Sequence, residues 1–213
     1  MTATWQMVAA ERTALCDALD TLSEDQWQHP SALRGWLVRH VVAHLVWPLE
    51  TSLLRLGLQA LRHGGSLRAT DAVAEGDRRP GPELARTLRL HADTPRFRFP
   101  GRGIESPLAE TVLHALDVRL PLGLGHAIPG ATARVVLDTL VSPTASRGYS
   151  PPHRFDGLRL RATDLDWAHG DGPGLEGPVD ALLITLAGRG IAIDRLAGEG
   201  VEILKSRRGK GRA

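Results

Sequence analysis

Apolar side chains recur at helical spacing through the first 120 residues of this chain, and prolines and glycines divide the pattern into segments. One segment covers about residues 4–21, and a longer one covers about residues 37–65. A third helix is expected from Gly81 with a proline in its first turn, and a fourth with Ser106 as its cap and Pro107 at its first position. Four helices joined by loops predict an up-and-down four-helix bundle.

The pattern changes after Gly125. A helical stretch follows, and then apolar and polar residues alternate in GLRLRATDLDWAHGDG, which indicates strands. GPVDALLITLAGR returns to helical spacing, and GVEIL is predicted to form a last strand. The sequence therefore predicts an α+β, mainly α, fold class, with a four-helix bundle at 1–125, a small α+β domain at 126–204 and a basic disordered tail at 205–213.

Charge and composition exclude several classes of protein. The tail holds five basic residues and no acid, whereas the rest of the chain has 21 basic and 24 acidic residues. Such a mildly acidic body does not favour nucleic-acid binding. No run approaches the roughly 18 apolar residues of a membrane span, and no secretory signal begins the chain. We therefore expect a cytoplasmic protein without nucleic-acid or membrane partners.

The chain contains a single cysteine, Cys16. Cys16 alone cannot form an internal disulfide or a Cys-rich zinc motif. No cation is placed to lower its pKa, so we expect Cys16 to be a small core residue.

Two histidines one turn apart interrupt the apolar stretch RGWLVRHVVAHLVWP. His44 shares a helical face with Val41 and Trp47, which is typical of a core histidine or of a metal ligand. His40 lies towards the more polar side and suits an exposed or supporting role. Pro48 removes a backbone donor and is expected to kink this helix at His44.

The segment AETVLHALD places Glu110, His114 and Asp117 on one helical face. A solvated polar face would have the same spacing. However, a core-facing histidine on one helix and E-x-x-x-H on a facing helix are what a bundle needs to hold a metal. Two imidazoles and one carboxylate form a ligand set of catalytic zinc sites, which keep a fourth position open.

The stretch GWLVRHVVAHL resembles the G-W-[ST]-V-R-[DE]-V-V-A-H-L signature of the mycothiol-dependent maleylpyruvate isomerase family, a branch of the DinB-like metal-binding bundles. SEDQWQHPS, AETVLHALDVRLPLG and GLRLRATDLDWAHGDGPGLEGPVDALLITLAGR also match family segments in order, so the resemblance covers nearly the whole chain. It implies a DinB-like four-helix bundle followed by a small domain related to sterol-carrier modules. It also implies that His44, Glu110 and His114 bind a divalent metal, with zinc expected and nickel or iron as alternatives.

This chain departs from the signature at two positions, because His40 replaces an acid and Leu37 replaces a small hydroxyl residue. An acid at position 40 can cap the helix or orient a ligand's ring nitrogen. Asp117, one turn beyond His114, is expected to orient that ligand instead. His40 remains a second candidate for a supporting role.

The resemblance also implies a catalytic arginine in the second domain, which the LAGR match assigns to Arg189. An arginine that satisfies helix-end carbonyls would occupy the same position. Asp164 and Asp166 resemble a carboxylate pair, but we expect them to serve the Gly-rich turn that follows.

By this resemblance the chain is an enzyme that uses a metal and a low-molecular-weight thiol, mycothiol or another sugar-linked thiol, on a small electrophilic substrate. The reaction would be an isomerisation or an S-transfer, with Arg189 neutralising substrate charge and the sulfur supplied externally because Cys16 is the only cysteine. Two other classes stay open: a non-catalytic metal-binding or regulatory module, and a structural homodimer. Both a monomer and a homodimer are compatible with the sequence.

Overall fold

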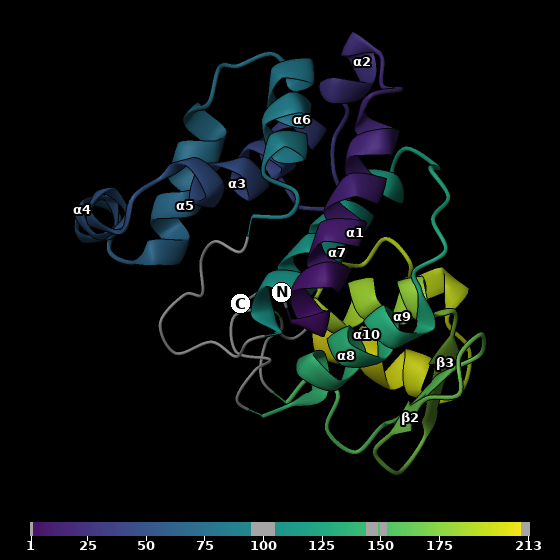
Figure 1. Cartoon of the computed structure of the whole chain (residues 1–213). Helices are drawn as coiled ribbons and strands as arrows, with labels where there is room; N and C mark the ends of the chain where they lie inside the picture. Colours follow the sequence, from purple (N-terminus) through teal and green to yellow (C-terminus); the bar gives the residue numbers. More distant parts are fainter. Residues whose placement is uncertain (1, 95–104, 144–148, 150–152, 210–213) are drawn as a thin grey trace. The chain divides into compact units, whose positions relative to one another are not determined.

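The computed structural model describes residues 2–94, 105–143, 149 and 153–209 of the chain (Figure 1). It divides after Gly125 into two compact units. The first unit contains seven helices among its described residues, namely α1 (Ala3–Leu19), α2 (Glu24–Trp27), α3 (Val38–Glu50), α4 (Leu53–His63), α5 (Ser66–Gly76), α6 (Gly81–Leu90) and α7 (Ser106–Arg119).

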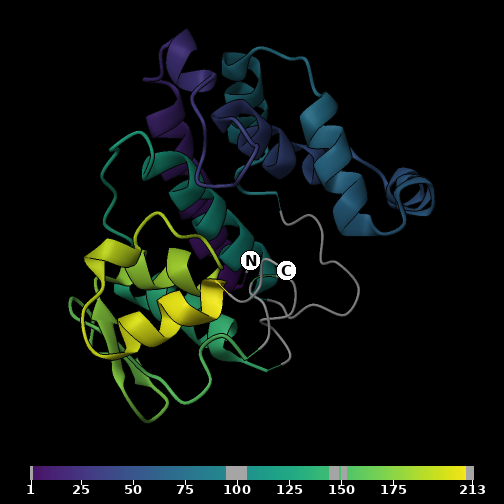
Figure 2. The same cartoon turned by 180° about the vertical axis from the view of Figure 1, so that it is seen from behind.

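Four helices of the first unit form a bundle in which each packs against two others. α1 contacts α6 and α7, and α3 contacts the same two helices. Figures 1 and 2 show α1 lying beside α7 from both sides. These four helices correspond to the four predicted segments, so the predicted bundle is confirmed.

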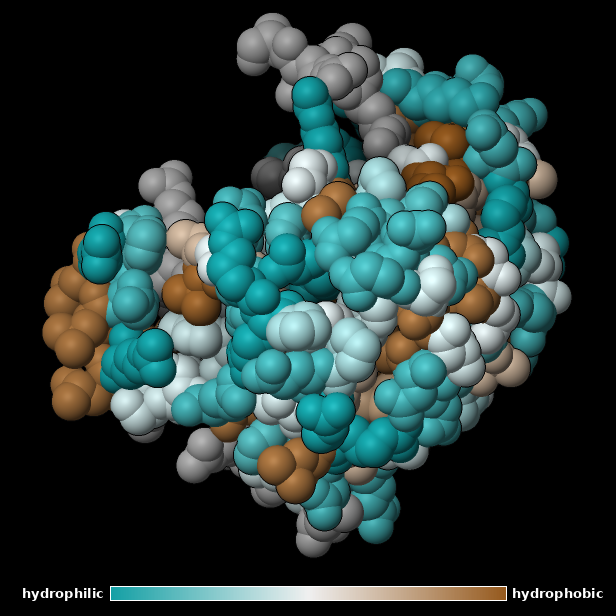
Figure 3. Space-filling model, turned by 90° about the horizontal axis from the view of Figure 1, so that it is seen from above, coloured by the Kyte–Doolittle hydropathy of each residue, from teal (hydrophilic) through white to brown (hydrophobic). Residues whose placement is uncertain are grey.

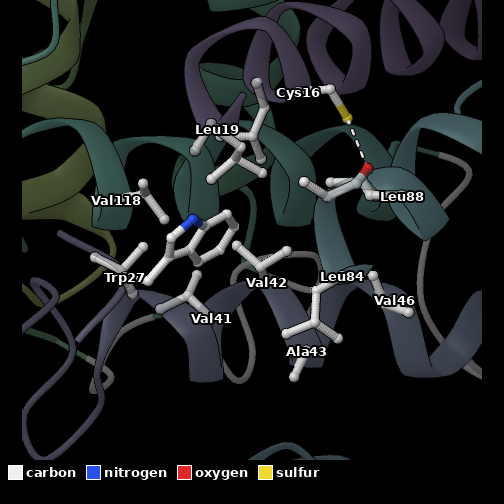
Figure 4. Packing of buried hydrophobic residues seen from close by; sticks show 14 of the residues in the cluster. Cys16, Leu19, Trp27, Val41, Val42, Ala43, Val46, Leu84, Leu88 and Val118 are labelled. Carbon is white, nitrogen blue, oxygen red and sulfur yellow. Dashed lines mark hydrogen bonds between the residues drawn. The ribbon is translucent and has the colours of Figure 1, made fainter. Parts of the chain in front are cut away.

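The bundle core closes around Trp27, whose side chain is 1% exposed (Figure 4). The short helix α2 holds this residue, and Ser23 caps the start of α2 with a capping box, in which Ser23 and Gln26 exchange hydrogen bonds. α6 approaches the indole through Gly81, where a Cβ atom would lie 2.0 Å from Trp27 Cδ2. Only glycine fits at this point of contact.

The second predicted segment is broken after Pro48, while the kink expected at His44 stays a prediction. α3 continues through Pro48 to Glu50, and the helix is interrupted at Thr51, whose backbone is extended with ψ 153°. The apolar segment therefore forms two helices, α3 and α4. α5, which follows α4 and packs against α3 and α4, was not predicted.

α4 turns an apolar face outward. Leu54, Leu58 and Leu61 are 75%, 60% and 83% exposed. Figure 3 shows this patch at the left of the view, over α4. α4 thus differs from the four bundle helices, whose apolar faces are buried.

The second unit combines helices with a small sheet. Its described elements are α8 (Gly130–Val141), β1 (Arg159–Ala162), β2 (Ala168–His169), β3 (Gly174–Gly177), α9 (Val179–Leu186), η1 (Ile193–Arg195) and α10 (Gly200–Gly209). The strand order is β2-β1-β3, with β1 antiparallel to β2 and parallel to β3. Leu160 of β1 is buried opposite Leu175 of β3, while Arg159 and Arg161 are exposed. The alternation predicted for this stretch is confirmed.

The end of the chain corrects two predictions. GVEIL does not form a strand but belongs to α10, because its buried side chains, Val201 and Leu204, are three residues apart, which is helical spacing. The disordered tail predicted from residue 205 is wrong as far as Gly209. Lys205 pairs with Glu202 at 2.9 Å, and Arg207 donates to two backbone carbonyls of an earlier loop. Residues 210–213 lie outside the described part of the chain.

Candidate metal centre

His44, Glu110 and His114 come together between α3 and α7. Glu110 Oε2 lies 3.2 Å from His114 Nε2 and 3.9 Å from His44 Nε2. The two imidazole centroids are 4.8 Å apart in an edge-to-face arrangement. One ligand atom from each of the three side chains lies within 4.8 Å of the other two. The structure therefore places the three predicted ligands at one point, while metal binding itself stays a prediction.

The second ring nitrogen of each histidine faces an acid. His114 Nδ1 is 2.9 Å from Asp117 Oδ2, and Asp117 is completely buried. His44 Nδ1 is 3.4 Å from Asp71 Oδ1 of α5. A histidine that binds a metal through Nε2 usually donates its Nδ1–H to a carboxylate or carbonyl. Both rings thus have the surroundings of metal ligands.

The donor set fits a divalent cation. Two imidazoles and a carboxylate suit zinc at about 2.0–2.1 Å from each atom, which requires ligand atoms within roughly 4.2 Å of one another. The present separations of up to 4.8 Å would need only a small contraction. The side chains of His44, His114 and Glu110 are 13%, 8% and 21% exposed, so the site is largely shielded.

The charges of the cluster also favour a cation. Burial opposes ionisation of Glu110, but the neighbouring imidazoles of His114 and His44 outweigh it and hold the pKa of Glu110 well below its ordinary value. Burial would lower the pKa of His114, whereas hydrogen bonds with Asp117 and Glu110 raise this pKa to about 9. Without a metal, a proton on His114 therefore balances the carboxylates at neutral pH. A bound cation would replace that proton.

Of the two residues expected to support the ligands, Asp117 contacts a candidate ligand and His40 caps a helix. Asp117 contacts His114 in the way the sequence predicts. His40 instead accepts the Leu37 N–H at its Nδ1, 3.2 Å away, so it caps the start of α3. An acid at position 40 would accept the same Leu37 N–H. Histidine can therefore replace the acid of the family signature without losing this cap.

Arg189 lies in the second unit, just after α9. Its guanidinium donates to the Ala187 carbonyl at 2.6 Å, and its backbone N–H donates to Ile184. This arrangement serves the carbonyl end of α9. A catalytic role for Arg189 stays a prediction.

The remaining candidates have structural roles. Asp164 accepts the Val179 N–H at 2.8 Å and so caps α9, and Asp166 lies in the same turn between β1 and β2. Cys16 is fully buried and its Sγ donates to the Ala85 carbonyl at 3.7 Å. Figure 4 shows this contact inside the core.

The sequence reasoning missed the contribution of α5. Besides Asp71, this helix supplies Glu75, which accepts the Trp36 indole N–H at 2.9 Å. The Trp36 ring in turn packs on His44, with ring centroids 5.4 Å apart. The only sequence signal was the i, i+4 spacing of two acids, which is typical of any solvated helix face.

Comparisons with known proteins give one family match and two similar crystal structures. The family model described as the mycothiol maleylpyruvate isomerase N-terminal domain matches residues 8–119, more than half of the chain. A crystal structure of the mycothiol-dependent maleylpyruvate isomerase is similar, with a TM-score of 0.59, 15% identity and 92% of each chain covered. A histidine-to-alanine mutant of that enzyme gives a TM-score of 0.58 and 13% identity, again with 92% of each chain covered. No curated protein matches the chain.

At these identities the two crystal structures establish the fold, and the predicted fold class is confirmed. Within the described residues, no helix has the length and apolar character that a membrane span requires. The family match covers α1 after its first turn and extends to the end of α7, which includes all three candidate ligands. The chain belongs to the mycothiol maleylpyruvate isomerase N-terminal domain family.

Proposed function

We propose that this protein is a metal-dependent enzyme that uses an external low-molecular-weight thiol to isomerise, or to transfer sulfur to, a small electrophilic substrate. The observation that carries the proposal is the convergence of His44, Glu110 and His114, with an acid behind each imidazole. Membership of a family named for a mycothiol-dependent isomerase supports the thiol-dependent, isomerase-like role.

The bundle residues would hold the metal and leave room for a reactant. His44, Glu110 and His114 supply three ligands, and a three-ligand zinc site keeps one position open. A divalent cation there would supply Lewis acidity that lowers the pKa of a coordinated thiol. Asp117 would keep His114 in the tautomer that presents Nε2 to the ion. We propose zinc, because the donor set suits it.

The sulfur must come from outside the protein. Burial raises the pKa of Cys16 to about 11, and its side chain has no exposed surface. A thiol in this state is neither ionised nor accessible at neutral pH. We therefore propose mycothiol, or another sugar-linked thiol, as the cofactor in a reducing cytoplasm.

The reaction class that fits is addition of an external thiolate to an activated double bond. Departure of the sulfur after bond rotation gives isomerisation, and its retention gives S-transfer. In both cases negative charge develops on the substrate, and we propose that Arg189 neutralises it. If Arg189 has this role, Arg189→Gln lowers kcat/KM without changing metal content, whereas unchanged kcat/KM would contradict a catalytic role for Arg189.

The decisive experiment measures metal content and thiol-dependent turnover on the full-length protein. We expect about one divalent ion per chain, with loss of the ion in His44→Ala and in His114→Ala. His63→Ala, at the end of α4, is a matched control and should keep the ion. Full metal content in both ligand variants contradicts the site. A metal-loaded protein that consumes no electrophile with any added thiol contradicts the enzymatic role.

A further inference from the structure

Two acids of α5 are linked to His44, Asp71 directly and Glu75 through Trp36. Asp71 Oδ1 lies 3.4 Å from His44 Nδ1, and Glu75, one turn later, holds the Trp36 indole against the His44 ring. Neither acid lies on a helix that carries a candidate ligand. α5 is therefore a third helix next to the metal centre, besides α3 and α7.

The surroundings of His44 Nδ1 are incomplete without Asp71. This nitrogen is buried and makes no hydrogen bond to any described residue. Leaving a buried polar nitrogen unpaired costs about 1–3 kcal/mol. Asp71 Oδ1 at 3.4 Å lies slightly beyond the usual hydrogen-bond distance, but its side chain is 49% exposed and can rotate. A shift of a few tenths of an ångström would close the bond.

His114, the other candidate ligand histidine, already makes the corresponding hydrogen bond to a carboxylate. His114 Nδ1 is bonded at 2.9 Å to Asp117, and its Nε2 faces Glu110. His44 has the same layout, with Nε2 towards Glu110 and Nδ1 towards Asp71. The difference is that Asp117 comes from the ligand's own helix, whereas Asp71 comes from a neighbouring one.

We propose that α5 completes the metal centre, with Asp71 and Glu75 as positioning residues for His44. Asp71 accepts the Nδ1–H of His44 and thereby leaves the Nε2 lone pair for the ion. Glu75 acts through Trp36, which limits rotation of the imidazole. This inference rests on the proposed metal-binding function.

The test compares Asp71→Asn and Glu75→Gln with Glu83→Gln, which removes one exposed carboxylate from α6 of the same unit. Zinc affinity is measured on the full chain by competition with a chromophoric chelator, and Co²⁺ absorption reports the coordination geometry. We expect Asp71→Asn to weaken zinc binding about 10- to 100-fold and to change the Co²⁺ spectrum. Glu75→Gln should weaken binding less, and Glu83→Gln should have no effect.

A second readout does not depend on metal. Imidazole ¹⁵N shifts of the metal-free protein, with His44 assigned by comparison with His44→Gln, report which ring nitrogen carries the proton. In the wild type we expect Nδ1–H, and in Asp71→Asn a mixture of tautomers, with the thermal melt of the metal-free protein nearly unchanged because Asp71 is half exposed.

The outcomes separate the two proposals. If the wild type binds zinc and Asp71→Asn binds it equally well, with the same Co²⁺ spectrum, the inference is wrong and the proposed function stands. If the wild type binds no zinc, the proposed function fails, and unchanged ¹⁵N shifts in Asp71→Asn would overturn the contact between Asp71 and His44 as well.

Discussion

The His114 imidazole lies between two carboxylates, so the metal-free and metal-bound forms of this residue must differ by a proton. Its pKa is raised to about 9, and a ligand nitrogen must be deprotonated. We expect zinc uptake between pH 7 and 8 to release about one proton per ion, and apparent affinity to rise with pH until about pH 9. Calorimetry in buffers of different ionisation enthalpy measures the released proton. A pH-independent affinity over this range would contradict the assignment.

The same proton affects the stability of the metal-free protein. The folded pKa of His114 exceeds its ordinary value of 6.5, so its contribution is fully present below about pH 6.5 and is lost as pH rises towards 9. We expect the melting temperature of the metal-free protein to fall between pH 7 and 9.5. His114→Gln cannot titrate and should show a shallower fall, and equal slopes for both proteins would refute this explanation.

Cys16 offers a test of where the reactive sulfur resides. Cys16→Ser places a hydroxyl in the core and should lower the free energy of unfolding by about 1–3 kcal/mol. Thiol-dependent turnover should be retained, because the buried sulfur has no access to substrate. A variant that binds metal normally but has no turnover would show that the sulfur is internal.

The candidate ligands and Asp117 could be picked out from the sequence, whereas Asp71 could not. His44, Glu110 and His114 stand out because titratable side chains on apolar or E-x-x-x-H helix faces carry a local signal. Asp71 carries none, since its position beside His44 depends on how α5 packs against α3. Such contacts between separate segments are decided by tertiary packing rather than by spacing.

Among the elements, α6 packs closely on α2 because Gly81 has no side chain to meet the Trp27 ring. Gly81→Ala would place its Cβ atom 2.0 Å from the Trp27 indole and should lower the free energy of unfolding by about 1–3 kcal/mol. Gly57→Ala is the matched control, because Gly57 lies within α4 with open space around it and should gain about 0.5–1 kcal/mol. Denaturant unfolding measures both, and an unaffected Gly81→Ala would contradict the packing of Trp27.

Element prediction succeeded where amphipathic spacing was strong and failed where it was weak. α5 was not predicted because its alanines do not mark an apolar or a polar face of a helix. Alanine is nevertheless the best helix former. α10 was mistaken for a strand because the five residues of GVEIL are too few to distinguish the two periods. The break of the second segment falls at Thr51, three residues after Pro48, so the proline alone did not locate it.

At the scale of the whole molecule, the division after Gly125 allows the first unit to be produced and tested without the second. A fragment of residues 1–125 contains the bundle core and all three candidate ligands. We expect it to fold and bind one divalent ion, but to turn over poorly because it lacks Arg189. Circular dichroism, metal analysis and the thiol assay test these points. Turnover equal to that of the full chain would exclude a catalytic role for the second unit.

The candidate ligands also belong to segments that are distant in sequence, since α4, α5 and α6 lie between α3 and α7 in the described part of the chain. An unfolded chain cannot present these ligands together, so an ion bound there would act as a reversible cross-link of the native state. Free metal at 100 times its dissociation constant would stabilise such a protein by about 2.7 kcal/mol. Metal supply would then set the lifetime of the protein against proteolysis as well as its activity, and metal starvation would remove the protein itself.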